Sequence, residues 1–168
     1  MNNIYQITWR RQLSLLSPCL IKTALFVIAY IYFLGLRISH PAYIVLLSVY
    51  FILDVLPTLI LHVQYLKDGR NKVMFINKDQ ETIIVQMGSI ERRYRFMDID
   101  QVEYHASFGG GSGWYSFGEY RFYKITFNDG YSINISCLMM KSIKYTFEPL
   151  LGIRAEPQLR ILPVMRLG

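Results

Sequence analysis

The longest apolar stretch in the sequence covers residues 41–66 and reads PAYIVLLSVYFILDVLPTLILHVQYL. It contains a single acidic residue, Asp54, and no lysine or arginine. About 20 predominantly apolar residues in a helix cross a bilayer core of about 30 Å. The stretch is therefore long enough to span a membrane, and Pro41 suits the first turn of a helix.

A second apolar stretch precedes it, over residues 20–36, and reads LIKTALFVIAYIYFLGL. It reaches spanning length when extended back to Leu13, with Lys22 as the one interruption. The alternative is a pair of buried helices in a soluble bundle, but such helices normally have a polar face, which neither stretch displays. A cleaved signal peptide is disfavoured because another apolar run follows at once. We therefore expect a transmembrane helical hairpin over residues 20–66.

The charges of the chain are unevenly distributed. They make up 18% of the 168 residues, against about 25% in an ordinary soluble domain, and residues 12–66 hold only Lys22, Arg37 and Asp54. Basic residues near membrane ends favour the cytoplasmic side, and they lie before and after the hairpin, at Arg10, Arg11, Lys67, Arg70 and Lys72. We predict a multi-pass protein of a bacterial inner membrane, with both termini cytoplasmic and residues 1–19 as a cytoplasmic segment.

Lys22 and Asp54 are the two charges inside the predicted hairpin. At 1.5 Å per residue, both lie about 22–25 Å from the turn between the two helices, and so at a similar depth in the bilayer. We expect an intramembrane Lys22–Asp54 pair that locks the two helices together. A proton relay through Asp54 and His62 is the functional alternative. Pro57 frees the Leu53 carbonyl, which predicts a kink.

Residues 67–168 have the pattern of a small cytoplasmic α+β domain. Short alternating runs predict six antiparallel strands, over residues 72–77, 81–87, 90–96, 99–107, 118–127 and 131–137. The last two flank Asn128-Asp129-Gly130, a strong hairpin signal. Residues 138–151 predict a C-terminal helix that ends at Gly152, and Pro157 and Pro163 interrupt the tail. We expect a curved antiparallel sheet or partial barrel, closed at one end by the helix.

This layout resembles the bacterial pleckstrin-homology-like (PH-like) domains of small membrane proteins, including the YcxB-like family. The residues that carry the resemblance are the opening hairpin at 72–87 and the segment Arg95-Phe96-Met97-Asp98-Ile99-Asp100-Gln101-Val102. The latter is similar to a recurrent aromatic-x-acid-Ile-x-x-Val entry into a strand. The resemblance implies two transmembrane helices, a cytoplasmic PH-like fold and no catalytic residues.

Two groups of residues are candidates for binding a headgroup or a partner protein. Arg92, Arg93 and Arg95 form the densest basic cluster, although alternation places Arg92 and Arg93 on opposite faces of the strand. Trp114, Tyr115 and Phe117 lie on a glycine-rich loop without charge, and aromatic residues favour membrane interfaces. The alternatives are a solvated strand face and a flexible connection.

Few features of the sequence indicate catalysis, metal binding, redox chemistry or nucleic-acid binding. Cys19 and Cys137 belong to no paired motif, the three histidines are scattered, and no nucleophile motif is present. From residue 64 onward, 14 basic residues oppose 11 acidic residues, too small an excess to indicate nucleic-acid binding. We expect no catalytic residues, no cofactor, no metal and no nucleic acid.

The sequence thus favours a non-enzymatic, membrane-tethered module that binds anionic lipid headgroups or a membrane protein partner. Two further hypotheses remain open. One is an immunity-type protein that protects against a membrane-acting toxin, and the other is an accessory subunit of a transporter or membrane enzyme, with Asp54 in a helix interface. Homo-oligomerisation also remains open.

Overall fold

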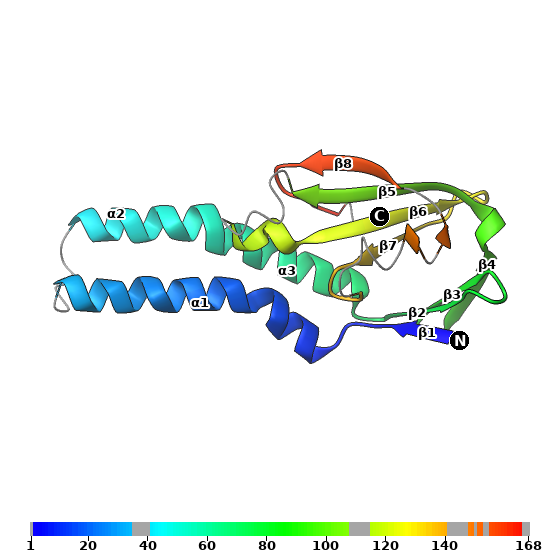
Figure 1. Cartoon of the computed structure of the whole chain (residues 1–168), viewed down its shortest axis with the longest axis horizontal. Coiled ribbons are helices and arrows are strands. Elements are labelled where there is room, and N and C mark those ends of the chain that lie inside the picture. Colours follow the sequence, from blue (N-terminus) through cyan, green and yellow to red (C-terminus); the bar gives the residue numbers. More distant parts are fainter. Residues whose placement is uncertain are drawn as a thin grey trace.

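A computed structural model describes residues 2–34, 41–107, 115–140, 148–149, 151–152 and 155–165. Its helical part consists of α1 (Trp9–Leu34), α2 (Pro41–Tyr50), the short π-helix η1 (Phe51–Val55) and α3 (Leu56–Gly69). These helices form a hairpin that projects from one end of a domain built on two sheets (Figure 1). The first helix starts at Trp9 rather than at the predicted residue 20, so most of the segment 1–19 is helical.

Pro18 lies inside α1 and lacks the backbone N–H that would bond to the Ser14 carbonyl. The hydroxyl of Ser17 donates to that carbonyl instead, at 2.9 Å. Figure 1 shows the first turns of α1 bent away from the rest of the helix. A proline kink with a local substitute donor explains how the helix continues through this bend.

The second apolar stretch changes its winding before Pro57. Residues Phe51–Val55 form the π-helix η1, in which the Leu56 N–H donates to the Phe51 carbonyl. The sequence predicts a kink here because Pro57 cannot donate, and the structure accommodates the proline by one turn of wider helix. Such π-helical turns occur often at functional sites, and this one contains Asp54.

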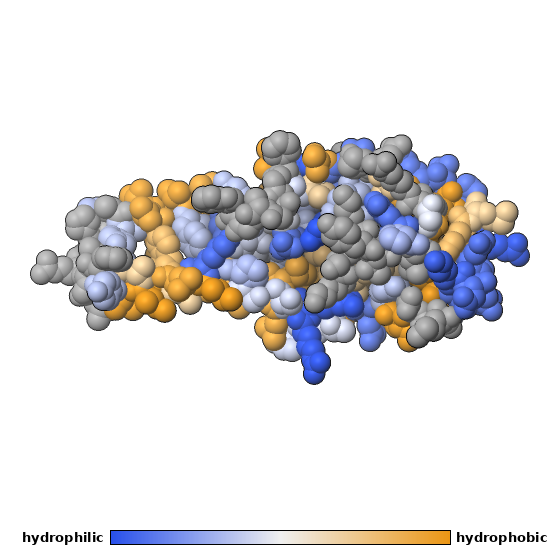
Figure 2. Space-filling view, viewed as in Figure 1, coloured by the Kyte–Doolittle hydropathy of each residue, from blue (hydrophilic) through white to orange (hydrophobic). Residues whose placement is uncertain are grey.

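Two helical stretches, Trp9–Tyr32 and Tyr43–Gly69, are long and apolar enough to cross a membrane by length and composition. The core helix of a soluble protein would be mostly buried, whereas only 6% and 17% of the residues are buried in the apolar 18-residue windows of these two stretches. Apolar side chains gather on the surface of the projecting half of the molecule, and hydrophilic ones gather at the opposite end (Figure 2).

The strands form two four-stranded sheets. The first has the order β1-β2-β3-β4 and the second the order β7-β6-β5-β8. The first sheet consists of β1 (Asn2–Tyr5), β2 (Lys72–Asn77), β3 (Thr82–Met87) and β4 (Ile90–Arg95). The second consists of β5 (Ile99–Ser107), β6 (Arg121–Phe127), β7 (Ser132–Ser136) and β8 (Glu156–Arg160). The six predicted strands correspond to β2 through β7, so the expected α+β class with antiparallel sheets is confirmed.

The hairpin is an insertion into the first sheet. β1 precedes the helices and β2 follows them, yet the two strands pair antiparallel from Asn2↔Asn77 to Tyr5↔Met74. The sequence analysis predicts that residues 1–19 lie outside the β domain. In the structure, β1 belongs to that domain and forms an edge strand of its first sheet. Both ends of the hairpin are therefore fixed to neighbouring strands.

The C-terminal part differs most from the sequence-based expectation. Residues 137–140 form a turn and a bend rather than the start of a helix. Glu148, Pro149 and Leu151 are helical, and residues 141–147 lie outside the described part of the chain. Strand β8 was not anticipated, and it runs parallel to β5. It contains Pro157, which is tolerated because β8 is an edge strand.

Side chains pack in two hydrophobic clusters, one on each side of the second sheet. The first fills the space between the sheets and includes Met74, Ile83, Tyr123 and Ile135. The second lies between the second sheet, α3 and the C-terminal segment, and its fully buried members include Leu61, Tyr65 and Tyr120. The hairpin is thus packed against the domain rather than joined to it by a loose linker.

Candidate functional site

Asp54 joins the hairpin to the β domain. Its Oδ1 accepts the backbone N–H of Ser116 at 2.6 Å, and its Oδ2 accepts the Ser116 hydroxyl at 2.7 Å. Ser116 opens the short 3-10 helix η3 (Ser116–Glu119), which leads into β6. Asp54 is only 5% exposed, so both carboxylate oxygens use their bonds inside the protein. The predicted pairing of Asp54 with Lys22 stays a prediction.

The second apolar stretch has a polar face that the sequence analysis missed. Thr58, His62 and Tyr65 follow Asp54 at helical spacing, and all four are buried. The Thr58 hydroxyl donates to the Asp54 carbonyl at 2.6 Å, and the Tyr65 hydroxyl donates to the Pro163 carbonyl at 2.8 Å. His62 Nδ1 lies 2.9 Å from the Tyr120 hydroxyl. The spacing i, i+4, i+8 and i+11 of these four residues could have predicted this face from the sequence, although most of their neighbours are apolar.

Tyr115 and Phe117, two of the three aromatic loop residues, lie beside this junction. Phe117 is buried in the cluster with Leu61 and Tyr65, whereas Tyr115 is 52% exposed and stacks on Phe117 with ring centroids 5.0 Å apart. Trp114 falls outside the described residues. The loop end therefore presents at least one exposed aromatic ring next to the apolar hairpin.

The three arginines of the basic cluster lie on β4, and all are exposed. The guanidinium of Arg92 lies 4.3 Å from the centroid of the Tyr131 ring, and its Nη1 donates to the Tyr94 hydroxyl at 3.5 Å. Arg93 and Arg95 alternate to the other face, as the sequence predicts. Arg92 is thus held by aromatic side chains, while Arg93 and Arg95 form the open basic surface.

β4 is an edge strand of the first sheet. The Phe96 N–H donates to the Glu81 carbonyl beyond the end of β3, so alternation in an antiparallel pair directs the N–H groups of Arg93 and Arg95 away from β3. That of Arg95 donates to Asp98 Oδ2 at 2.7 Å. No strand among the described residues pairs with this edge around Arg93, so another strand could add to it.

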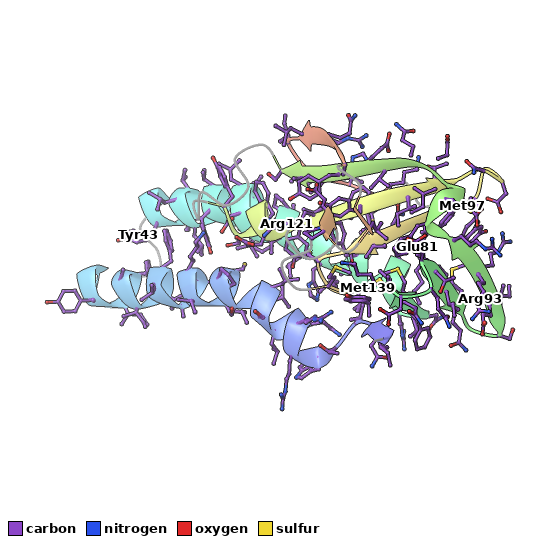
Figure 3. The ribbon with its side chains drawn as sticks, turned by 45° about the vertical axis from the view of Figure 1, so that its right-hand side comes forward. Tyr43, Glu81, Arg93, Met97, Arg121 and Met139 are labelled. Carbon is purple, nitrogen blue, oxygen red and sulfur yellow. The ribbon has the colours of Figure 1, made fainter. Side chains whose placement is uncertain are left out.

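The structure does not bring the arginines together with Tyr115 and Phe117, the two aromatic residues of the loop that it describes. In Figure 3 the hairpin residue Tyr43 and Arg93 lie at opposite ends of the molecule, with Arg121 between them. The arginines therefore lie at the far end of the domain from the hairpin, and the aromatic residues lie at the near end. A single site formed by both groups is excluded by this geometry.

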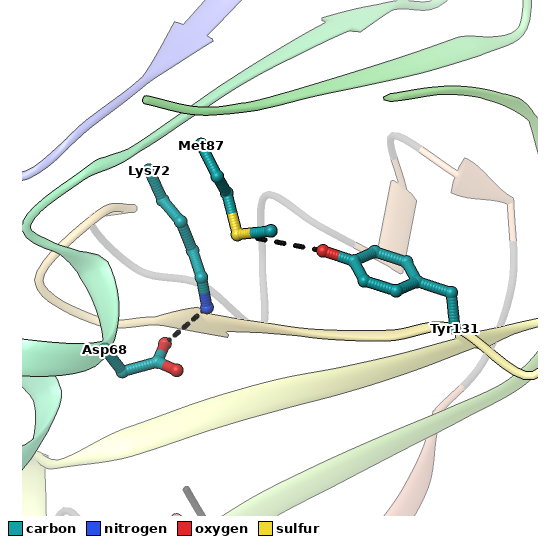
Figure 4. A network of polar contacts seen from close by, with 4 residues as sticks. All are labelled: Asp68, Lys72, Met87 and Tyr131. Carbon is teal, nitrogen blue, oxygen red and sulfur yellow. Dashed lines mark hydrogen bonds and ion pairs between the residues drawn. The ribbon is translucent and has the colours of Figure 1, made fainter. Parts of the chain in front are cut away.

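A cavity of about 640 Å³ lies on the outer side of the second sheet, between α3 and β8. His105 lines it, with Nε2 3.1 Å from Glu103 Oε2, and stacks on Phe122. Burial lowers the pKa of His105, and the neighbouring Glu103 partly opposes this shift. Figure 4 shows two contacts among the residues that line this cavity. One is the 2.7 Å ion pair between Lys72 and Asp68, and the other is the hydrogen bond from the Tyr131 hydroxyl to Met87 Sδ.

Cys19 and Cys137 are buried free thiols. Burial raises the pKa of Cys137 to about 11, which makes it a poor nucleophile at neutral pH. Among the residues that the structure describes, no group of three or more His, Cys, Asp or Glu side chains could hold a metal ion.

Comparison with known families identifies the fold. A family model described as a PH domain matches residues 4–146. The chain belongs to this PH domain family. The match includes the helical hairpin, in agreement with its insertion between β1 and β2. No curated protein and no solved structure matches the chain significantly.

Proposed function

We propose that this PH-family protein is a membrane-anchored binding module, held by its hairpin at the inner face of a bacterial membrane with both termini cytoplasmic. The observation that carries the proposal is the exposed apolar surface of a hairpin inserted between two paired strands. An exposed apolar surface that extends along two long helices is not stable in water and requires a bilayer or a partner.

The length of the apolar surface supports a bilayer as that environment. Beyond the exposed Trp9, exposed apolar side chains extend from Leu13 to Tyr32 on α1, and others extend from Ile44 to Val63 on the second helical stretch. Each distance corresponds to a rise of about 29 Å along a helix, close to the thickness of a bilayer core of about 30 Å. Lys67 follows Val63 on α3 and Arg11 precedes Leu13 on α1, as expected for a cytoplasmic boundary.

The proposed binding surface for a partner protein is the β4 edge. It points away from the hairpin, is exposed and carries Arg93 and Arg95, so it suits an extended acidic segment that adds as a further strand. Tyr115, at the opposite end of the domain, would contact the membrane interface. Under this proposal the hairpin raises the local concentration of the β4 edge at the membrane.

Site-specific photo-crosslinking in cells tests the proposal. A photoreactive residue replacing Glu91 on β4 should give a discrete protein adduct in the membrane fraction, and the same residue replacing Lys78 in the β2–β3 turn should not. Carbonate extraction in parallel should leave the chain in the membrane. Release by carbonate would contradict the anchor, and equal adducts from both positions would contradict the β4 site.

The intramolecular contact of Asp54 bears on the alternative of an accessory subunit. In that hypothesis Asp54 would bond to a helix of another protein, yet both of its carboxylate oxygens already accept bonds from Ser116. We therefore propose that Asp54 orients the domain on its own hairpin.

A further inference from the structure

A cavity of about 490 Å³ lies where the first turns of α1 meet the start of β6. Its polar lining includes Arg10, Arg11 and Arg121, with Glu119 as the acidic member. Glu119 accepts a 2.8 Å bond from Arg121, and no carboxylate among the described residues forms an ion pair with Arg10 or Arg11. The cavity therefore has an excess of positive charge concentrated on α1.

One guanidinium nitrogen of Arg11, a residue that lines this cavity, is buried without a partner among the described residues. Nη1 of Arg11 has no hydrogen-bond acceptor among the described residues. A buried charged donor without an acceptor is costly. An anion in the cavity that draws the Arg11 side chain toward it would supply the missing acceptor, and a phosphate group can bond several guanidinium N–H groups at once.

The position of the cavity selects the kind of anion. On α1 the exposed aliphatic side chains begin at Leu13, and the exposed Trp9 precedes them, at a place where amphipathic aromatic rings favour the membrane interface. Arg10 lies about 4.5 Å from Leu13 along the helix axis. Lipid headgroups occupy a layer of about 5–7 Å on each side of the hydrocarbon core. Leu15, Pro18 and Met140 add an apolar wall to the same cavity. Cationic and apolar linings at this depth match the phosphate and the upper acyl chain of one lipid.

We infer that this cavity binds the headgroup of an anionic phospholipid from the inner leaflet, with Arg10, Arg11 and Arg121 contacting the phosphate. This inference rests on the membrane insertion in the proposed function but uses a different surface from the β4 edge. Since both α1 and β6 contribute residues to the lining, the bound lipid would fix the angle between the hairpin and the domain.

The test measures lipid binding to the full chain by native mass spectrometry, after delipidation in mild detergent. Phosphatidylglycerol should bind in preference to phosphatidylcholine. The double variant R10Q/R11Q should weaken phosphatidylglycerol binding about tenfold or more, given about 1 kcal/mol for each basic residue near an anionic surface. The matched control K78Q/K124Q removes the same charge outside the cavity and should bind as the wild type does.

Three outcomes would overturn the inference. They are equal binding of both lipids, equal loss in the two double variants, and competition by millimolar glycerol 3-phosphate, which would identify a free phosphate as the ligand. The variant R121Q adds a check from the domain side of the cavity and should also weaken binding. Carbonate extraction of R10Q/R11Q separates the two proposals, because the inference can fail while the chain still inserts.

Discussion

Asp54 is a buried carboxylate that joins the hairpin to the β domain through Ser116. It accepts two bonds from Ser116 at the point where a π-helix widens the hairpin before Pro57. The backbone N–H of Ser116 is buried, so loss of its acceptor would leave a donor without a partner. The contact therefore has a measurable cost when it is removed.

Replacement of Asp54 by alanine is expected to destabilise the chain by about 1–3 kcal/mol, the cost of a buried unsatisfied polar group. The variant Ser116→Ala removes only the hydroxyl bond and should cost less. Thermal unfolding of the full chain in detergent provides the measurement, and Leu53→Ala, an exposed position in the same π-helix, is the control. A melting temperature for Asp54→Ala equal to that of the control would contradict the assigned contact.

The pH dependence of stability should reflect His105. Its pKa lies below the ordinary 6.5, chiefly because of burial, so the unfolded chain binds this proton more readily than the native protein does. The stability contributed by neutral His105 is present above pH 6.5 and is lost as the pH falls through the native pKa. The melting temperature should fall from pH 7.5 to pH 5 more steeply in the wild type than in His105→Gln. Parallel curves would contradict this role.

At the residue scale, the sequence allowed the chemistry of Asp54 to be noticed but not its contact with Ser116. Asp54 is conspicuous in an apolar stretch, and depth counting pointed to Lys22. The contact with Ser116 depends on how the domain packs against the hairpin, which no local pattern encodes. The buried face through Thr58, His62 and Tyr65 was visible in its spacing, yet each residue is also tolerated in a membrane helix.

The strands show which elements can be predicted from local patterns. β2 and β5 have the bounds that the sequence predicts, because alternation is clear in both. The hairpin signal is also confirmed, with Gly130 at φ 80°, a conformation that favours glycine. β1 and β8 were not predicted, since each is short and forms only by pairing with a distant strand.

The β4 edge gives a prediction that concerns the whole strand rather than one side chain. Proline at position 93 removes the outward-facing N–H while leaving the pairing with β3, which edge strands tolerate. Arg93→Pro should therefore abolish the crosslink formed from position 91. Arg93→Gln keeps the N–H and should weaken the crosslink only in part. Equal effects of the two variants would mean that charge, and not strand addition, accounts for the binding.

At the scale of the molecule, the insertion of the hairpin between β1 and β2 constrains its topology. Since these strands are paired, the start of α1 and the end of α3 must lie on the same side of any membrane that the hairpin crosses. The basic residues at both ends agree with this arrangement. The positions of these basic residues in the sequence also predict that both termini lie on one side, although they do not reveal that the sheet itself requires it.

Cysteine accessibility tests the membrane hairpin most directly. Single cysteines replace Ser39, in the connection between the apolar segments, or Ser89, in the β3–β4 turn, in a chain with Cys19 and Cys137 changed to serine. A membrane-impermeant maleimide added to intact spheroplasts should label the cysteine at position 39 and reach that at position 89 only after lysis. Labelling of both positions before lysis, or of neither, would contradict a hairpin that spans the membrane with its PH domain inside.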